Sequence, residues 1–208
     1  MRDISFLLKA NWVLVLMNFL AHLSLSDDQE GLMIGNAIAD FTRKKYYDHF
    51  PSEVRRGILL HHFIDDFTDS HAVVGEMLEK WRPIQGKYAG VVNDIIMDHF
   101  LARDFETIAG QKLQDFSQSV YESFRKNWEI IPERAQHTFH YMEKGDWLYH
   151  YQFESGIERS LSGMSRRAQN SNRMAEAVQQ LRRDYDFFEE RFKIFYPELE
   201  EAVRSFLK

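Results

Sequence analysis

Apolar residues in this chain recur at intervals of three and four positions rather than two, and this spacing predicts α-helices throughout. A stretch that opens after Pro51 keeps the helical spacing to about Asp69, since proline is tolerated in the first turn of a helix. The last segment, residues 185–206, predicts a long amphipathic helix that Pro197 kinks or restarts.

Proline and glycine mark the boundaries of the other predicted helices. Pro83 and Gly86 precede a second pattern with helical spacing at residues 91–101, and Pro132 begins a further candidate. The sequence contains no sustained alternation of apolar and polar residues, no internal repeat and no linker rich in proline, glycine or serine. We therefore expect an all-α fold, a compact helical bundle formed as a single domain.

The composition supports a folded domain and limits the chemistry open to it. The chain has 208 residues, of which 44% are apolar, and 26 basic against 32 acidic residues give a net charge of −6. An acidic chain has no global reason to bind nucleic acid. The sequence contains no cysteine, so any metal must be held by histidine and carboxylate side chains.

The stretch at residues 6–25 is rich in apolar side chains but is a poor membrane span, because Lys9, Asn11, Asn18 and His22 interrupt it. No small-x-small cleavage site follows it, so it is a poor secretory signal as well. We expect a cytoplasmic protein that does not enter a membrane. Its oligomeric state stays open.

Histidine and aspartate cluster inside two of the predicted helices. His61, Asp65 and Asp69 are four positions apart, so a helix places them on one face, where they could converge on a cation. In the second helix, Asp94 and Asp98 share a face with His99 adjacent to them. That helix can therefore also present a carboxylate and an imidazole.

Two further polar residues stand in apolar surroundings. His22 lies within an apolar run and Asp40 ends the mostly small and apolar stretch 35–40, so both side chains are expected in the interior. A buried carboxylate is costly unless it is paired or bound to metal, and a shared divalent cation would satisfy all of these groups together. A plainer interpretation also fits, in which His22 is an ordinary core or surface histidine, Asp40 a helix cap and the carboxylates from Asp65 to Asp69 a solvated face.

Other motifs for chemistry are missing from the sequence. No histidine has a glutamate three positions before it, as a di-iron bundle requires. The sequence also has no Gly-rich phosphate loop, Gly-x-Ser-x-Gly motif or His-Glu-x-x-His motif. The helical cluster of histidine and aspartate is therefore the candidate for chemistry.

The same residues resemble the acyl carrier protein phosphodiesterases, a family regarded as divergent relatives of the HD metal-dependent phosphohydrolases. The resemblance covers nearly the whole chain from Met17 onward. It is carried by the motifs at residues 17–23, 35–36, 39–41, 57–58, 61, 64–65, 68–69, 94 and 98–101, and by the later landmarks Trp147-Leu148 with Tyr151 and Gly163-Met164-Ser165 with Arg167.

The resemblance implies a fold like that of the HD phosphohydrolases and a division of the chain. Family members begin with the methionine that matches Met17, so residues 1–16 are expected to be an N-terminal extension or the product of an upstream start. Residues 17–208 are then a single helical phosphodiesterase domain.

The resemblance also implies the reaction, which is hydrolysis of the phosphodiester that joins 4′-phosphopantetheine to a serine of holo-acyl carrier protein. It implies a divalent cation, manganese first, with magnesium or iron(II) as alternatives. We hypothesise that Asp69 or Asp94 steers the attacking water. The residues expected to bind the cation or to orient its ligands are His22, Asp40, His61, Asp65, Asp98 and His99.

The carrier protein is acidic, so docking on this acidic chain needs a local positive surface. Arg43 and Lys44 follow Asp40 closely, and Arg167 lies in the last landmark, so these three are the predicted substrate-binding residues. Two rival functions stay open. One is an HD-type phosphohydrolase acting on a nucleotide or small phosphate ester, and the other is a non-catalytic helical protein that binds acyl carrier protein.

Overall fold

The computed structural model describes residues 19–26, 29–168 and 170–208, and within these ranges it contains helices and no strands. The all-α prediction is confirmed. The extension predicted at residues 1–16, and Met17, lie outside the described residues. The α-helices are α2 (Phe19–Ser24), α3 (Glu30–Ile38), α4 (Ser52–Ser70), α5 (Ala72–Gln85), α6 (Ala89–Arg103), α7 (Phe105–Ala109), α8 (Leu113–Lys126), α9 (Glu133–Lys144), α10 (Trp147–His150), α11 (Glu154–Arg167), α12 (Ala177–Arg183) and α13 (Tyr185–Leu207). Short 3₁₀ segments are η1 (Ala39–Phe41), η2 (Lys44–His49), η3 (Gly86–Tyr88) and η4 (Met174–Glu176).

Proline and glycine place several helix boundaries close to the predicted ones. α4 begins one residue after Pro51, and α9 begins one residue after Pro132. Gly86 follows the end of α5 with a φ of +56°, a conformation that favours glycine. α13 continues through Pro197 as one helix, so the predicted restart at this proline does not occur.

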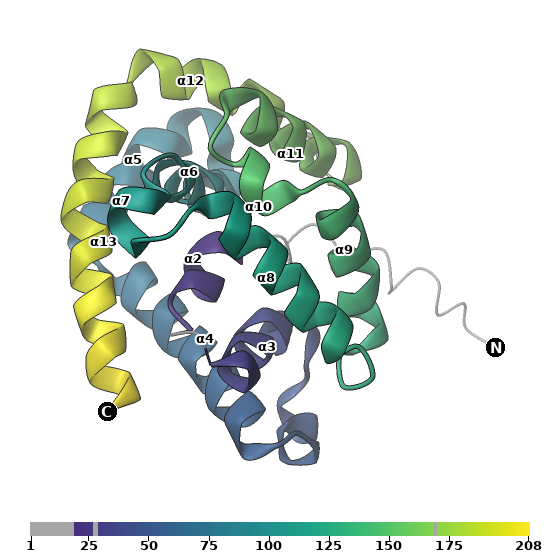
Figure 1. Ribbon diagram of the computed structural model, residues 1–208. Coiled ribbons are helices and arrows are strands. Elements are labelled where there is room, and N and C mark those ends of the chain that lie inside the picture. Colours follow the sequence, from purple (N-terminus) through teal and green to yellow (C-terminus); the bar gives the residue numbers. More distant parts are fainter. Residues whose placement is uncertain (1–18, 27–28, 169) are drawn as a thin grey trace.

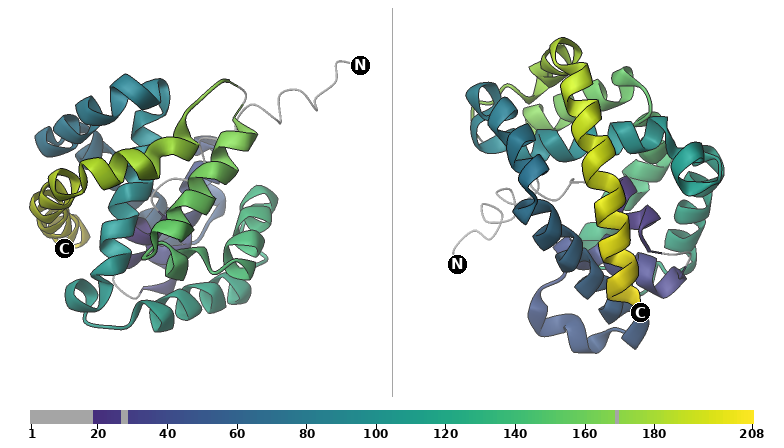
Figure 2. Two further views of the ribbon diagram at one scale, coloured as in Figure 1. Left: turned by 90° about the horizontal axis from the view of Figure 1, so that it is seen from above. Right: turned by 90° about the vertical axis from the view of Figure 1, so that its left-hand side faces the viewer.

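Helix α6 lies at the centre of the fold, where α2, α5, α11 and α13 pack against it. Twelve of its 15 residues are buried, including Asp98 and His99. Figure 1 shows α13 along one side of the molecule, with α8, α9 and α11 on the other side. The right-hand view of Figure 2 shows α13 running along the length of the molecule on the side that faces the viewer. Polar side chains on α6 must therefore find their partners inside the protein.

Helices α3 and α4 approach each other closely because each has a glycine at the contact. A Cβ atom on Gly35 would lie 1.9 Å from the carbonyl oxygen of Val54, and one on Gly57 would lie 2.1 Å from that of Leu32. No larger residue fits at either position without moving the helices apart. This close packing positions the residue after Gly35, which is Asn36, against the histidines of the neighbouring elements.

The buried apolar residues form one cluster that extends from α2 to α13. None of the helices in the described ranges is both long enough and apolar enough to span a lipid bilayer.

Candidate metal centre

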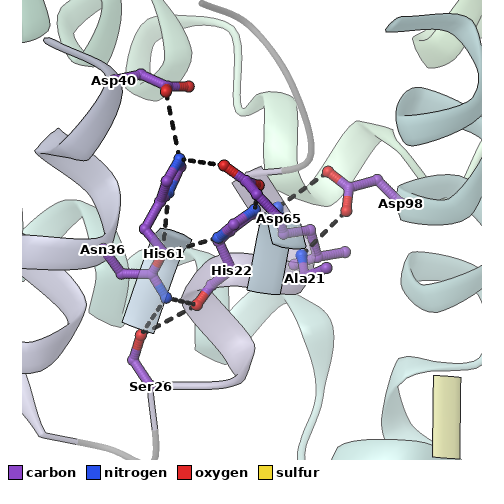
Figure 3. A network of polar contacts seen from close by, with 9 residues as sticks. Ala21, His22, Ser26, Asn36, Asp40, His61, Asp65 and Asp98 are labelled. Atoms are coloured by element: carbon purple, nitrogen blue, oxygen red, sulfur yellow. Dashed lines mark hydrogen bonds and ion pairs between the residues drawn. The ribbon is translucent and has the colours of Figure 1, made fainter. Parts of the chain in front are cut away.

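Two histidines and one aspartate converge beside the contact between α3 and α4 (Figure 3). His22 comes from α2, whereas His61 and Asp65 lie one turn apart on α4. The two oxygens of Asp65 lie 3.3 Å from His22 Nε2 and 3.2 Å from His61 Nε2. The imidazole rings stack with their centroids 4.2 Å apart. Both rings therefore turn their Nε2 atoms toward one carboxylate.

The side chain of Asn36 fixes the orientation of both imidazoles. Its amide nitrogen lies 2.7 Å from the carbonyl oxygen of His22, which can only accept a hydrogen bond, so the amide oxygen must face the rings. That oxygen lies 2.8 Å from His22 Nδ1 and 3.2 Å from His61 Nδ1. Both Nδ1 atoms must therefore donate, which leaves both Nε2 atoms of the neutral rings with a lone pair.

The donor set at this centre fits a divalent cation. His61 Nε2 is buried and makes no hydrogen bond, although oxygens of Asp65 and Asp40 lie 3.2 and 3.3 Å away. A lone pair that faces two carboxylates at this range is stable only with a proton or a cation between them. Imidazole nitrogen combined with carboxylate oxygen is a ligand set used by divalent first-row metals.

The pKa values show where a proton sits when no cation is bound. Burial lowers the pKa of His61, but the contacts with Asp40 and Asp65 outweigh burial and raise it to about 9. Burial and the charge of His61 lower the pKa of His22. Burial raises the pKa of Asp65, but the contacts with both histidines outweigh it and keep that pKa below its usual range. In the metal-free protein these shifts favour a second ring proton on His61, at Nε2.

Asp40 joins this cluster from the solvent side and not from the interior, which corrects the expectation of a buried side chain. It lies in η1, where the chain leaves α3, and its side chain is 39% exposed. Exposure lets the carboxylate keep part of its hydration, which reduces the cost of placing it beside Asp65. Asp40 is thus an accessible carboxylate at the mouth of the cluster.

Asp69 and Asp94 lie at the edge of the same group of carboxylates. Asp69 is exposed on α4, one turn beyond Asp65, and burial together with the charges of Asp65 and Asp66 raises its pKa. Asp94 is partly buried on α6. Burial, followed by the charges of Asp98, Asp65, Asp69 and Asp40, raises the pKa of Asp94 well above its usual value. Asp94 is therefore within electrostatic range of these carboxylates.

Asp98 and His99 lie outside the group formed by His22, His61 and Asp65. The two oxygens of Asp98 accept the backbone N–H groups of Leu20 and Ala21, each at 3.0 Å, so this carboxylate holds the start of α2 (Figure 3). His99 Nδ1 lies 2.8 Å from the carbonyl oxygen of Tyr151 and therefore donates to it. Its Nε2 lies 3.3 Å from the hydroxyl of Tyr185, on α13. Both side chains thus connect α6 to other parts of the fold.

The predicted substrate-binding residues lie in two places. Arg43 and Lys44 are exposed beside Asp40, where η2 packs on α4 through a hydrogen bond of 2.7 Å between the Tyr47 hydroxyl and His62 Nε2. Arg167 is exposed at the end of α11 and lines a separate cavity between α10 and α11.

Asn36 is the residue whose role the sequence analysis missed. It is 1% exposed and contacts both histidines, but the sequence pattern identified it only as a family landmark. The available signal was its position, because an amide within the apolar segment of α3 must find hydrogen-bond partners when it is buried.

Comparison with known proteins matches nearly the whole chain to one family. The family model described as "Acyl carrier protein phosphodiesterase" matches residues 17–199. A protein of that name from Enterobacter sp. (strain 638) is 32% identical over 184 residues, which is 88% of this chain and 95% of the relative. Another from Escherichia coli O6:H1 is 33% identical over 193 residues, which is 92% of this chain and 100% of the relative. No solved structure matches the chain.

Proposed function

This chain belongs to the acyl carrier protein phosphodiesterase family, and from that premise we propose that it hydrolyses the phosphodiester between 4′-phosphopantetheine and a serine of holo-acyl carrier protein. The products are the apo-protein, with a free serine hydroxyl, and 4′-phosphopantetheine. The observation that carries the proposal is the convergence of His22, His61 and Asp65 on one point, with both imidazoles oriented by Asn36.

We propose that these three side chains hold a divalent cation, manganese first, with Asp40 able to join them from the solvent side. The buried Nε2 atom of His61, which makes no hydrogen bond but lies between the carboxylates of Asp65 and Asp40, supports this assignment. When bound, such a cation neutralises phosphate charge and lowers the pKa of a bound water. Asp98 then acts through α2, because its carboxylate holds the first turn of the helix that presents His22.

The surrounding carboxylates supply the proton transfers that the reaction needs. Water attacks phosphorus and the bond from phosphorus to the serine oxygen breaks, so the water loses a proton and the serine oxygen gains one. Asp94 is suited to donate that proton, because burial and the neighbouring carboxylates favour its protonated form. Asp69, exposed one turn beyond Asp65, is suited to orient the water and accept its proton.

We further propose that the carrier protein docks on the basic segment formed by Arg43, Lys44 and Lys45. These three side chains are exposed next to Asp40, and none of them forms an ion pair with an acidic residue in the described ranges. An acidic partner would therefore meet free positive charge at the mouth of the centre. For such a substrate the cytoplasm, expected from the sequence, remains the proposed compartment.

The decisive experiment measures the intact mass of holo-acyl carrier protein after incubation with the purified protein and Mn²⁺. We expect the carrier protein to lose the mass of phosphopantetheine, and we expect chelator to block this loss. Asp65→Asn should abolish it, because the substitution removes the carboxylate that both histidines face. Asp66→Asn is the matched control, since Asp66 is the next residue on α4, is exposed and lies outside the metal-binding group.

Three outcomes would contradict parts of this proposal. If the carrier protein keeps its mass while the protein binds Mn²⁺, the proposed substrate is wrong. If turnover continues in chelator, the metal assignment is wrong. If Asp65→Asn and Asp66→Asn lose activity equally, the centre does not lie at Asp65.

A further inference from the structure

A cavity of about 320 Å³ lies between α10 and α11, away from the histidine cluster. Three arginines of α11, namely Arg159, Arg166 and Arg167, line it together with His150 of α10. No aspartate or glutamate is among its lining residues, although the whole chain carries a net charge of −6. The lining of the cavity is therefore positively charged, although the protein as a whole has a negative net charge.

The three arginines have no acidic partner within the described part of the chain. Arg182, on the neighbouring α12, shows the usual behaviour, since it pairs with Glu154 at 2.7 Å. By contrast, burial and the adjacent positive charge of Arg166 lower the pKa of Arg167. Unpaired guanidinium groups that face one cavity repel one another, and a bound anion relieves that repulsion.

Glycine forms part of the wall of this cavity. Gly163 lies on the same helix between Arg159 and Arg166, and a Cβ atom there would lie 3.8 Å from Nη2 of Arg167. Any longer side chain at this position would extend toward the guanidinium groups. Earlier on α11, a Cβ atom on Gly156 would lie 1.9 Å from the carbonyl oxygen of His150, so this glycine lets α10 and α11 pack closely.

We propose that this arginine pocket binds the dianionic phosphate of a phosphate monoester. Guanidinium groups recognise phosphate through paired hydrogen bonds, and three of them match a doubly charged group better than a singly charged one. A phosphate monoester carries nearly two negative charges at neutral pH, whereas a phosphodiester carries one. The concave shape selects a small anion rather than an acidic protein surface.

The proposed function supplies one such ligand, and on this point the inference rests on it: hydrolysis of the diester releases 4′-phosphopantetheine, which is a phosphate monoester. The pocket is adjacent to the helix that carries Asp94. The backbone carbonyl of Tyr151, a residue in the wall of the pocket, accepts the hydrogen bond from His99 of α6. Burial, together with the charge of Asp98 on the same helix α6, raises the pKa of the Tyr151 hydroxyl above its usual value. A product that leaves the centre carries a new negative charge, which the arginines of this pocket can accept.

Calorimetric titration of the full chain in chelator tests the proposal without turnover. The probes are inorganic phosphate, 4′-phosphopantetheine and pantetheine, which lacks the phosphate. We expect both phosphate-bearing probes to bind and pantetheine not to bind. Tighter binding of 4′-phosphopantetheine than of inorganic phosphate assigns the pocket to the product, whereas equal affinities assign it to free phosphate.

Four variants locate the binding. Arg159→Ala and Arg166→Ala should each weaken phosphate binding by about tenfold, through the loss of one charge-assisted contact. Gly163→Leu should weaken it equally while keeping every charge. Arg183→Ala is the control, because Arg183 is an exposed arginine of α12 outside the cavity, and it should bind phosphate as the unmodified chain does.

Absence of phosphate binding to the unmodified chain would overturn the proposal, and so would unchanged affinity in both arginine variants. Loss of carrier-protein binding in Arg166→Ala, without any phosphate binding, would show that the arginines serve a protein surface instead. Because these titrations contain no metal and need no catalysis, a failure here is distinguishable from a failure of the proposed hydrolysis.

Discussion

Replacing Asn36 by alanine is expected to separate folding from cation binding at this centre. The side chain makes four hydrogen bonds: its oxygen accepts from His22 Nδ1 and His61 Nδ1, and its nitrogen donates to the His22 carbonyl and to Ser26 Oγ. Alanine removes all four. Both imidazoles then lose the contact that keeps their protons on Nδ1 and their Nε2 lone pairs directed at Asp65.

The structure sets the expected size of both effects. Four hydrogen bonds at about 1 kcal/mol each amount to about 4 kcal/mol of lost stability. This is less than the roughly 5–15 kcal/mol typical of a folded domain, so the Asn36→Ala variant should still fold. Loss of a residue that orients metal ligands typically weakens metal binding by about 10- to 100-fold, and we expect a loss in that range.

Two matched variants distinguish orientation of the ligands from stability. Ser26→Ala removes two hydrogen bonds of the same buried network, from Ser26 Oγ to the His22 carbonyl and from the Asn36 amide nitrogen to Ser26 Oγ, but touches neither imidazole. It should lower the free energy of unfolding by about 2 kcal/mol and leave Mn²⁺ affinity unchanged. Asn36→Asp keeps an acceptor for both Nδ1 atoms and should retain more Mn²⁺ affinity than Asn36→Ala.

The assay combines urea unfolding in chelator with calorimetric titration of Mn²⁺ at a temperature where each variant is folded. The reasoning is refuted if folded Asn36→Ala binds Mn²⁺ as tightly as Ser26→Ala does. Equal affinities would mean that the histidines keep their orientation without the amide, and Asn36 would then serve packing alone.

Three further results are expected. Gly35→Ala should destabilise the protein by several kcal/mol and weaken Mn²⁺ binding, because α3 and α4 must move apart, whereas Gly75→Ala, with open space around it, should unfold at the same or higher urea concentration. The pKa of His61 is raised from 6.5 to about 9, so its proton stabilises the metal-free protein fully below about pH 6.5 and this contribution is lost as the pH rises through about 9. Mn²⁺ must displace that proton, so the increase in Tm caused by Mn²⁺, read by scanning fluorimetry, should be larger at about pH 8.5 than at about pH 6.5; an increase that does not change with pH would contradict this. Lys44→Glu should lower kcat/KM for holo-acyl carrier protein several-fold at low salt and less at high salt, whereas Lys112→Glu, an exposed charge at the start of α8, should not; equal losses would remove the case for docking at η2.

The fold was predictable because its boundaries depend on local chemistry. Pro51 and Pro132 precede helices in the structure as the sequence predicts, and each is the N-cap residue just before the first helical turn. The spacing of His61 and Asp65 placed them on one face of α4 for a similarly local reason, and they do face the same point. Periodicity within one helix is enough for such statements.

Relations between helices could not be read from the same pattern. Asp98 and His99 are adjacent on α6, yet one contacts the start of α2 and the other contacts Tyr151 and Tyr185. Asp40 follows a run of small apolar residues but lies in a turn that carries it to the surface. In each case the contacts of the side chain depend on which other segment of the chain packs against its helix or turn. The spacing of residues in a single sequence does not give that information.

The centre depends on three buried contacts that lie behind the ligands. Asp98 holds the start of α2, the glycines hold α3 against α4, and Asn36 fixes both rings. Because folding assembles all three, His22, His61 and Asp65 are held in place by the protein itself. Under the proposed metal assignment, a cation would not have to order its ligands. The energetic cost of this arrangement falls on the metal-free protein, because the carboxylates of Asp65 and Asp40 both face His61 Nε2. A proton on that nitrogen then takes the place proposed for the cation.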